Sequence, residues 1–239
     1  MKVEIIKCLE DNYSYLLINE KNQNACIIDP SESKPIIELI EKKKINLKFI
    51  LNTHHHYDHV GGNIELKKKY KAKIIGFKND KSRIPEIDIL VEDNEIWKNE
   101  DFESKIFHIP GHTSGHICFY FAKDKIVFTG DTLFSLGCGR IFEGTYKQMF
   151  ESLNKLKELP KETKIFCGHE YTLKNSMFCE KYEENNNNLK KKIIEIEHKL
   201  KNNLPTIPST IEEELACNIF LRAKNLQDFS KLRDLKDNF

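Results

Sequence analysis

The sequence has almost no net charge and no long apolar run. Its 239 residues include 38 lysines and arginines against 37 aspartates and glutamates, for a formal charge of +1. This balance gives no overall field to attract polyanions, so the composition argues against a nucleic acid partner. Because no apolar run approaches the roughly 18 residues that a spanning helix needs, we also expect no membrane association.

The cysteines are isolated, odd in number and without any Cys-x-x-Cys spacing. The seven are Cys8, Cys26, Cys118, Cys138, Cys167, Cys179 and Cys217. Their spacing argues against a disulfide framework and a thiolate zinc site, and it suits a reducing compartment. The first residues carry no secretory-signal pattern. We therefore expect the cytoplasm, with an organellar protein that has lost its transit peptide as the alternative.

Short apolar runs separated by turn signals fill the first part of the chain. Five runs predict strands: Tyr15–Ile18, Ala25–Ile28, Leu47–Leu51, Ile117–Phe121 and Ile126–Phe128. Helical spacing predicts helices at Lys34–Lys44 and Tyr146–Leu156. Strand signals stop after about Tyr171. We expect a mixed α and β domain over residues 1–172 and a helical domain over residues 173–239.

The helical part contains its own signals for the start and end of helices. Four apolar residues at helical spacing predict a core helix: Leu189, Ile193, Ile196 and Leu200. The asparagine run 185–188 before them predicts a solvated loop or helix start. After two prolines, Ser209 and Glu212 stand three apart, which predicts a capping box and the start of another helix.

The segment Thr53–Gly62 holds the strongest chemical signal. It reads Thr-His-His-His-Tyr-Asp-His-Val-Gly-Gly and begins one residue after the apolar run Leu47–Leu51. His-x-His-x-Asp-His offers three imidazoles and one carboxylate within six positions, which are enough ligands for two adjacent metal ions. An internal position, a preceding buried strand and the embedded aspartate argue against a surface histidine cluster.

Three later segments each place one further ligand type beside a glycine after a strand-like run. They are Gly111-His112-Thr113, Thr129-Gly130-Asp131-Thr132 and Cys167-Gly168-His169-Glu170. A single histidine or aspartate in such a place is usually structural. Together with Thr53–Gly62, these segments complete a ligand set.

In this order the ligand residues resemble the binuclear metallo-β-lactamase superfamily across the first 170 or so residues. The resemblance implies an α+β fold, an αββα sandwich followed by a small C-terminal helical domain. It places His54, His56 and His112 on one metal and Asp58, His59 and His169 on the other, with Asp131 bridging both. It gives no ligand role to His55, His108, His116 or His198, although His108 and His116 flank the site and could lie behind the ligands.

Two metals in such a site lower the pKa of a shared water and stabilise an oxyanion, so no serine or cysteine nucleophile is needed. Asp58 and Asp131 are thus the expected catalytic carboxylates. Histidine and carboxylate ligands admit two zinc ions as the first choice, with iron or manganese as alternatives. Asp29 ends the run Ala25–Ile28. An ordinary turn at Asp29 is the preferred interpretation, and orientation of a ligand histidine is the alternative.

The expected substrate contacts come from the same resemblance. The segment 133–145 resembles the glutathione-binding loop of the glyoxalase II family, with Arg140 at a Lys or Arg position and Phe142 where tyrosine is common. The resemblance to this family covers nearly the whole chain. Tyr171 resembles a glutathione contact. In the helical domain, Arg222 and, more weakly, Lys224 would bind the glycine carboxylate by charge-assisted hydrogen bonds. On the residues alone, a surface ion pair is the better interpretation of Arg222.

The resemblance implies a hydroxyacylglutathione hydrolase. It would cleave S-2-hydroxyacylglutathione thioesters, such as S-D-lactoylglutathione, to D-lactate and glutathione by a metal-bridging hydroxide, the second step of methylglyoxal detoxification. We expect a small glutathione thioester as the partner and a monomer or weak homodimer. The alternatives are a one-iron glutathione-persulfide dioxygenase, a catalytically idle metal-binding protein and, less favoured, a nuclease of this fold.

Overall fold

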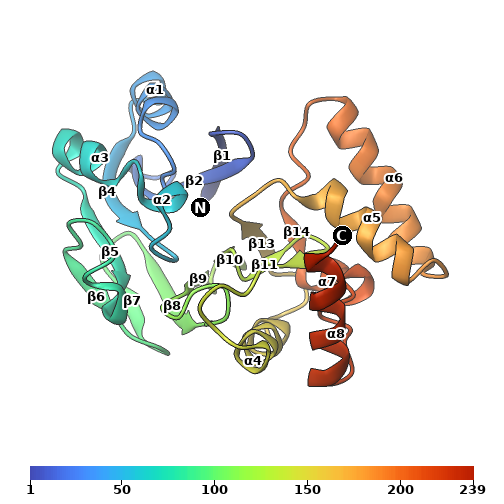
Figure 1. Cartoon of the computed structure of the whole chain (residues 1–239). Helices are drawn as coiled ribbons and strands as arrows, with labels where there is room; N and C mark the ends of the chain where they lie inside the picture. Colours follow the sequence, from blue (N-terminus) through green and yellow to red (C-terminus); the bar gives the residue numbers. More distant parts are fainter. The chain divides into compact units, whose positions relative to one another are not determined.

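The computed structural model describes residues 1–239 and divides into two compact units (Figure 1). The first unit comprises Met1–His108 and Gly115–Asp124. The second comprises Ile109–Ser114 and Lys125–Phe239. The division that the sequence predicts at residue 172 follows the change from strands to helices and remains a prediction.

A six-stranded sheet forms the centre of the first unit, in the order β1-β2-β3-β4-β5-β6. Its strands are β1 (Lys2–Cys8), β2 (Asn12–Ile18), β3 (Asn24–Ile28), β4 (Asn46–Leu51), β5 (Lys73–Phe77) and β6 (Ile89–Val91). The pairs β1/β2 and β2/β3 are antiparallel, and the pairs from β3 to β6 are parallel. Since β3 and β4 are parallel neighbours, their carboxyl ends lie at the same edge of the sheet.

The first unit also contains three α-helices and a second ladder of strands, which is antiparallel. The helices are α1 (Lys34–Lys43), α2 (Tyr57–Val60) and α3 (Asn63–Tyr70), with a 3₁₀ turn η1 at Lys78–Asp80. Helix α1 packs against β1, and α3 packs against β4 and β5. The ladder joins β7 (Ile96–Lys98), β8 (Glu103–His108) and β9 (Ile117–Phe121).

Branched aliphatic side chains build the core of the first unit. Ile27 on β3 and Ile50 on β4 are fully buried, and Ile36 and Ile40 of α1 belong to the same cluster. Strand β3 is buried along nearly its whole length, which explains why it reads as a continuous apolar run without alternation.

The second unit combines a short ladder with five helices. Strand β10 (Ile126–Gly130) pairs in parallel with β13 (Lys164–Cys167), which pairs antiparallel with β14 (Ser209–Thr210). A hairpin joins β11 (Leu133–Phe134) to β12 (Gly137–Cys138). The helices are α4 (Tyr146–Lys157), α5 (Thr172–Tyr182), α6 (Asn187–Lys201), α7 (Ile211–Cys217) and α8 (Leu226–Asp237). Helix α5 packs against α6, and α4 against α8. None of the helices is long and apolar enough to cross a membrane.

Most predicted elements are found within one to three residues, with two corrections after residue 171. One is the two-residue strand β14, which the sequence pattern does not predict. The other is the capping box of α7, predicted at Ser209 and Glu212 but formed by Thr210 and Glu213. Ser209 pairs with Ile165 in the ladder, so the chain stays extended for one more residue. The asparagine run does begin a helix, because the Asn186 side chain caps α6.

The burial of Ile50 on β4 makes a stability prediction. Ile50→Ala should lower the free energy of unfolding by about 2–5 kcal/mol, because a fully buried side chain leaves a cavity. The control Ile64→Ala removes a side chain that is 52% exposed, and it should stay within about 0.5 kcal/mol of the parent. Urea titrations measure both, and equal losses would contradict this account of the core.

Candidate metal centre

The predicted ligands of the first unit lie just after β4. His54 and His56 are in the irregular segment after the strand, whereas Asp58 and His59 lie on the short helix α2. The predicted loop is therefore partly helical. His54 and His59 are buried, and His56 and Asp58 are half-buried.

A hydrogen-bonded network behind these ligands fixes their tautomers. Asp29 accepts from the Thr53 hydroxyl at 2.6 Å and lies 3.1 Å from His59 Nδ1. The same hydroxyl lies 3.0 Å from His54 Nδ1. Because the hydroxyl proton goes to Asp29, the oxygen of Thr53 accepts from Nδ1–H of His54. Both rings therefore carry their proton on Nδ1 and present the Nε2 lone pair to a metal.

The remaining donor atoms of this unit converge on the Nε2 atoms. His59 Nε2 lies 3.5 Å from Asp58 Oδ2, and His54 Nε2 lies 3.2 Å from His56 Nδ1. Asn12 donates to Asp58 Oδ2 at 2.9 Å and to its backbone carbonyl at 3.2 Å. Asn12 is buried, and it limits the freedom of the half-buried carboxylate.

The predicted ligands of the second unit meet at one carboxylate. His112 Nε2 and His169 Nε2 lie 3.5 Å and 3.2 Å from the same oxygen, Asp131 Oδ2. His112 follows β8, Asp131 follows β10 and His169 follows β13, as the sequence predicts. Each of the three side chains is at most 8% exposed.

The donor set fits a divalent metal ion. His112 Nδ1 lies 2.8 Å from the carbonyl oxygen of Arg140, an atom that can only accept. His112 thus carries its proton on Nδ1 and turns the Nε2 lone pair toward Asp131, as a metal ligand would. Thiolates do not compete, because all seven cysteines are buried thiols, and burial raises the pKa of the Cys167 thiol to about 12.

Three histidines outside the predicted ligand set have other contacts. His55 Nδ1 lies 3.5 Å from Asp80 Oδ2, and Arg83 donates to Asp80 from the other side. His116 stacks on His54 with ring centroids 4.6 Å apart, so it packs directly behind a predicted ligand. His108 stacks on Phe77. The fourth, His198, lies on α6 beside Asn202.

Sequence reasoning considered Asp29 but preferred a turn, and it missed Asp80. Asp29 does have a left-handed φ of 46°, yet its buried carboxylate binds Thr53 and His59. The signal was available, because Asp29 ends the strand next to the one that leads into the histidine loop. Asp80 is 25 residues from His55 in the chain, and nothing in the local pattern links them.

The predicted substrate residues of the loop lie around the ligands of the second unit. Arg140 and Phe142 are exposed, and the Arg140 guanidinium lies 5.9 Å from the Phe142 ring. The Phe142 ring is 5.2 Å from the ring of His112. Tyr171 stacks on His169 at 4.7 Å with an interplanar angle of 7°. Both aromatic rings are therefore placed against predicted metal ligands.

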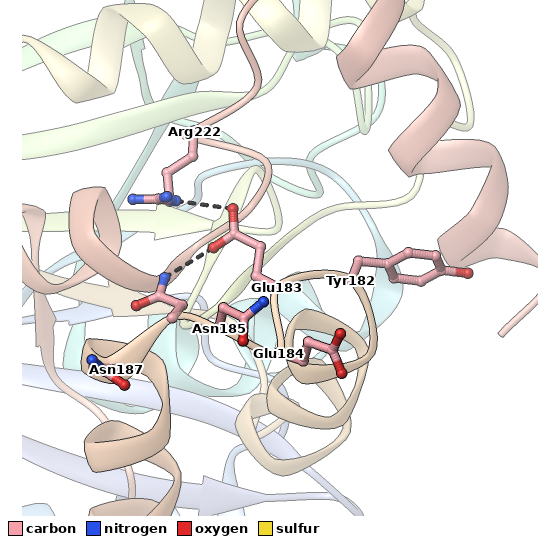
Figure 2. A pocket seen from close by; sticks show the side chains of 7 residues that line it. Tyr182, Glu183, Glu184, Asn185, Asn187 and Arg222 are labelled. Atoms are coloured by element: carbon pink, nitrogen blue, oxygen red, sulfur yellow. Dashed lines mark hydrogen bonds and ion pairs between the residues drawn. The ribbon is translucent and has the colours of Figure 1, made fainter.

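Arg222 and Lys224 are exposed in the tail. Arg222 Nε donates to Glu183 at 3.0 Å, which is the surface ion pair that the residue pattern favours. It also borders an open pocket of about 590 Å³ with Tyr182, Glu183, Glu184 and residues 185–187 (Figure 2). Lys224 lines a neighbouring pocket of about 360 Å³, in which Arg222 also takes part.

Comparisons with known proteins cover the whole chain. A family model described as metallo-beta-lactamase superfamily matches residues 10–169, and one described as hydroxyacylglutathione hydrolase C-terminus matches residues 170–239. The chain is 66% identical over 239 residues to the hydroxyacylglutathione hydrolase of Pelagibacter ubique strain HTCC1062, with 100% of both covered. It is 44% identical over 234 residues to that of Prochlorococcus marinus strain MIT 9301, with 97% of this chain and 94% of the relative covered.

Solved structures with the same fold are more distant in sequence. The BLEG-1 B3 metallo-β-lactamase superposes with a TM-score of 0.72 at 21% identity, covering 92% of this chain and 99% of that chain. ETHE1 from Myxococcus xanthus superposes with a TM-score of 0.75 at 22% identity, covering 98% and 90%. These similarities show the fold alone, and they confirm the predicted α+β fold of the metallo-β-lactamase type.

The network around Asp29 leads to a prediction on metal affinity. Asp29→Ala should weaken metal binding roughly 10–100-fold, because Thr53 and His59 lose the acceptor that fixes them. Competition with a chelator measures the affinity. Asp101→Ala is the control, since this carboxylate of the same unit accepts from three asparagines instead. A folded Asp29→Ala protein with parental metal affinity would contradict the assigned role.

Proposed function

Because the chain belongs to the hydroxyacylglutathione hydrolase family of the metallo-β-lactamase superfamily, we propose that it hydrolyses S-D-lactoylglutathione to D-lactate and glutathione. This is the second step of methylglyoxal detoxification. The chain is accordingly a thioester hydrolase that acts on S-2-hydroxyacyl thioesters of glutathione. The observation that carries the proposal is the convergence of two Nε2 atoms on the single carboxylate of Asp131.

We assign the ligands on the pattern of the family. One metal takes His54, His56 and His112, the other takes Asp58, His59 and His169, and Asp131 bridges both. The tautomers support this assignment for His54, His59 and His112, since each has its Nδ1 proton facing an acceptor. Two divalent ions bound there would lower the pKa of a water to give hydroxide near neutral pH and would polarise the thioester carbonyl.

The residues of the chain have the remaining tasks of binding and orientation. Arg140, Tyr171 and Arg222 are the proposed contacts of the glutathione portion, with Phe142 and Lys224 beside them. Holding the remote part of the substrate converts binding energy into orientation of the thioester. The leaving thiolate has a pKa of about 8.5, so departure needs no strong general acid. A site built from metal ligands fits this reaction, since the buried carboxylates beside them, Asp29 and Asp80, already bind Thr53, His59 and Arg83.

The finer points rest on the family and on the donor set. Histidine and carboxylate donors support zinc as the resident metal, with iron or manganese as alternatives. Residues 173–239 form the glutathione-binding helical domain in this proposal. We further propose that the enzyme acts in the cytoplasm as a monomer or weak homodimer, without a nucleic acid or membrane partner.

The reaction is tested with purified, metal-replete protein under nitrogen. It should cleave S-D-lactoylglutathione without oxygen. The loss of thioester absorbance and the release of free thiol measure this cleavage. Asp131→Ala should abolish turnover and lose metal by elemental analysis, whereas Asp234→Ala, which alters an exposed carboxylate bound to Tyr146, should retain both. Oxygen uptake with glutathione persulfide, together with negligible anaerobic thioester cleavage, would establish the dioxygenase alternative.

The role of Arg222 is separable from its ion pair. Arg222→Ala should raise KM for the glutathione thioester roughly 5- to 150-fold, which corresponds to a loss of about 1–3 kcal/mol of binding free energy. The kcat and the metal content should be unchanged. Glu183→Gln removes the charge that Arg222 now contacts, so it should not raise KM. If both variants raised KM equally, the pair would be structural and the carboxylate contact would be wrong.

A further inference from the structure

The hairpin Leu133–Cys138 contains an unusual turn. Leu136 has a left-handed φ of 57° without being a glycine, a conformation that costs of order 1 kcal/mol. The hairpin residues are buried, with Leu136 1% exposed. Buried backbone groups need hydrogen-bond partners, and a two-residue turn cannot supply them from within. Several of its partners lie far along the chain, on α5, at the end of α7 and on α8.

Glu214 and Asn218 bind the hairpin from one side. Glu214 Oε2 accepts from Leu136 N–H at 2.8 Å. Asn218 Nδ2 donates to the carbonyl of Gly137 at 3.0 Å and lies 3.4 Å from that of Phe134. Both side chains are fully buried. From the end of α7, the Glu214 carboxylate thus accepts from one backbone N–H of the hairpin, and the Asn218 amide faces two of its carbonyls.

The orientation of the Asn218 amide is determined by its own surroundings. Its Oδ1 accepts from the backbone N–H of Phe220 at 3.0 Å. Its Nδ2 also donates to Glu214 Oε2 at 2.9 Å. A flipped amide would place Oδ1 against a carboxylate and two carbonyls, so only one orientation satisfies these contacts.

Arg233 of α8 binds the end of the hairpin. Its Nη1 donates to the carbonyl of Cys138 at 2.8 Å, and its Nη2 donates to Asp237 at 2.8 Å. Arg233 is 4% exposed, and its guanidinium lies 5.2 Å from the ring of Phe220. A buried guanidinium on a backbone carbonyl is a strong, directional contact.

The hairpin continues directly into contacts with the predicted ligands. Gly139 donates to the carbonyl of Thr132 at 3.1 Å. A Cβ at this glycine would lie 1.8 Å from the carbonyl oxygen of Asp131, so the two segments are in close contact. The next residue, Arg140, supplies the carbonyl that receives the Nδ1 proton of His112. Cys138, at the end of the hairpin, is thus only two residues before the carbonyl that orients His112.

We propose that Glu214, Asn218 and Arg233 are positioning residues that hold the hairpin and thereby the carbonyl of Arg140. Through that carbonyl they fix the tautomer and direction of His112, so the helical tail sets metal retention as well as substrate binding. The step to the metal rests on the ligand role of His112 in the proposed function. The hold on the hairpin does not depend on it.

The test compares three variants on the same helix α8. Arg233→Met removes the donor, Arg233→Lys restores a cation and one donor, and Gln227→Met is the control at an exposed position. In metal-free full-length protein, hydrogen exchange of peptide 133–140 should be about tenfold faster in Arg233→Met, intermediate in Arg233→Lys and unchanged in Gln227→Met.

The second readout is the release of zinc to a chelator from the loaded protein. Release should be roughly tenfold faster in Arg233→Met and partly restored in Arg233→Lys. If Arg233→Met does not fold, Asn218→Ser replaces it in both measurements, because the shorter serine side chain removes the amide that donates to the hairpin carbonyl of Gly137. Exchange equal to that of Gln227→Met would overturn the proposal. Faster exchange with unchanged zinc release would overturn the step to His112. Neither readout requires thioester turnover, so a failure of the proposed reaction is distinguishable.

Discussion

A neutral imidazole can bind a metal through one nitrogen only if the other nitrogen keeps its proton, and the site depends on this constraint. Three acceptors meet it: the carboxylate of Asp29 behind His59, the hydroxyl of Thr53 behind His54, and a backbone carbonyl behind His112. Each acceptor is buried or part of the main chain. The orientation of these three proposed ligands is therefore determined by groups that are not proposed metal ligands themselves.

The proposed ligands could be named from the sequence because the information that marks them is local. His54–His59 follow a buried strand at fixed spacing, and His112, Asp131 and His169 each follow a strand beside glycine. Strand Ile117–Phe121 is predicted to the residue, because it is apolar throughout and bounded by turn signals. The sequence also predicts the fold class, although mainly through resemblance.

The remainder could not be predicted because it depends on contacts between distant residues. The bond from Asp29 to His59 spans 30 residues, and that from Glu214 to Leu136 spans 78. Short strands such as Ile96–Lys98 show too few buried positions to form a pattern. The capping box shifted by one residue because Ser209 pairs with a strand far away in the chain. Local propensity cannot report such pairings.

The contact between Arg233 and Cys138 joins residues 95 positions apart, close to the end of the chain. During synthesis the hairpin leaves the ribosome long before its arginine exists, and its Cys138 carbonyl must then bind water. Contacts of such separation form late, since closing a long loop costs chain entropy before the contact repays it. Helix α8 thus completes the contacts of a hairpin that is synthesised well before it, so the hairpin gains this hydrogen bond only after residues near 233 have folded against it.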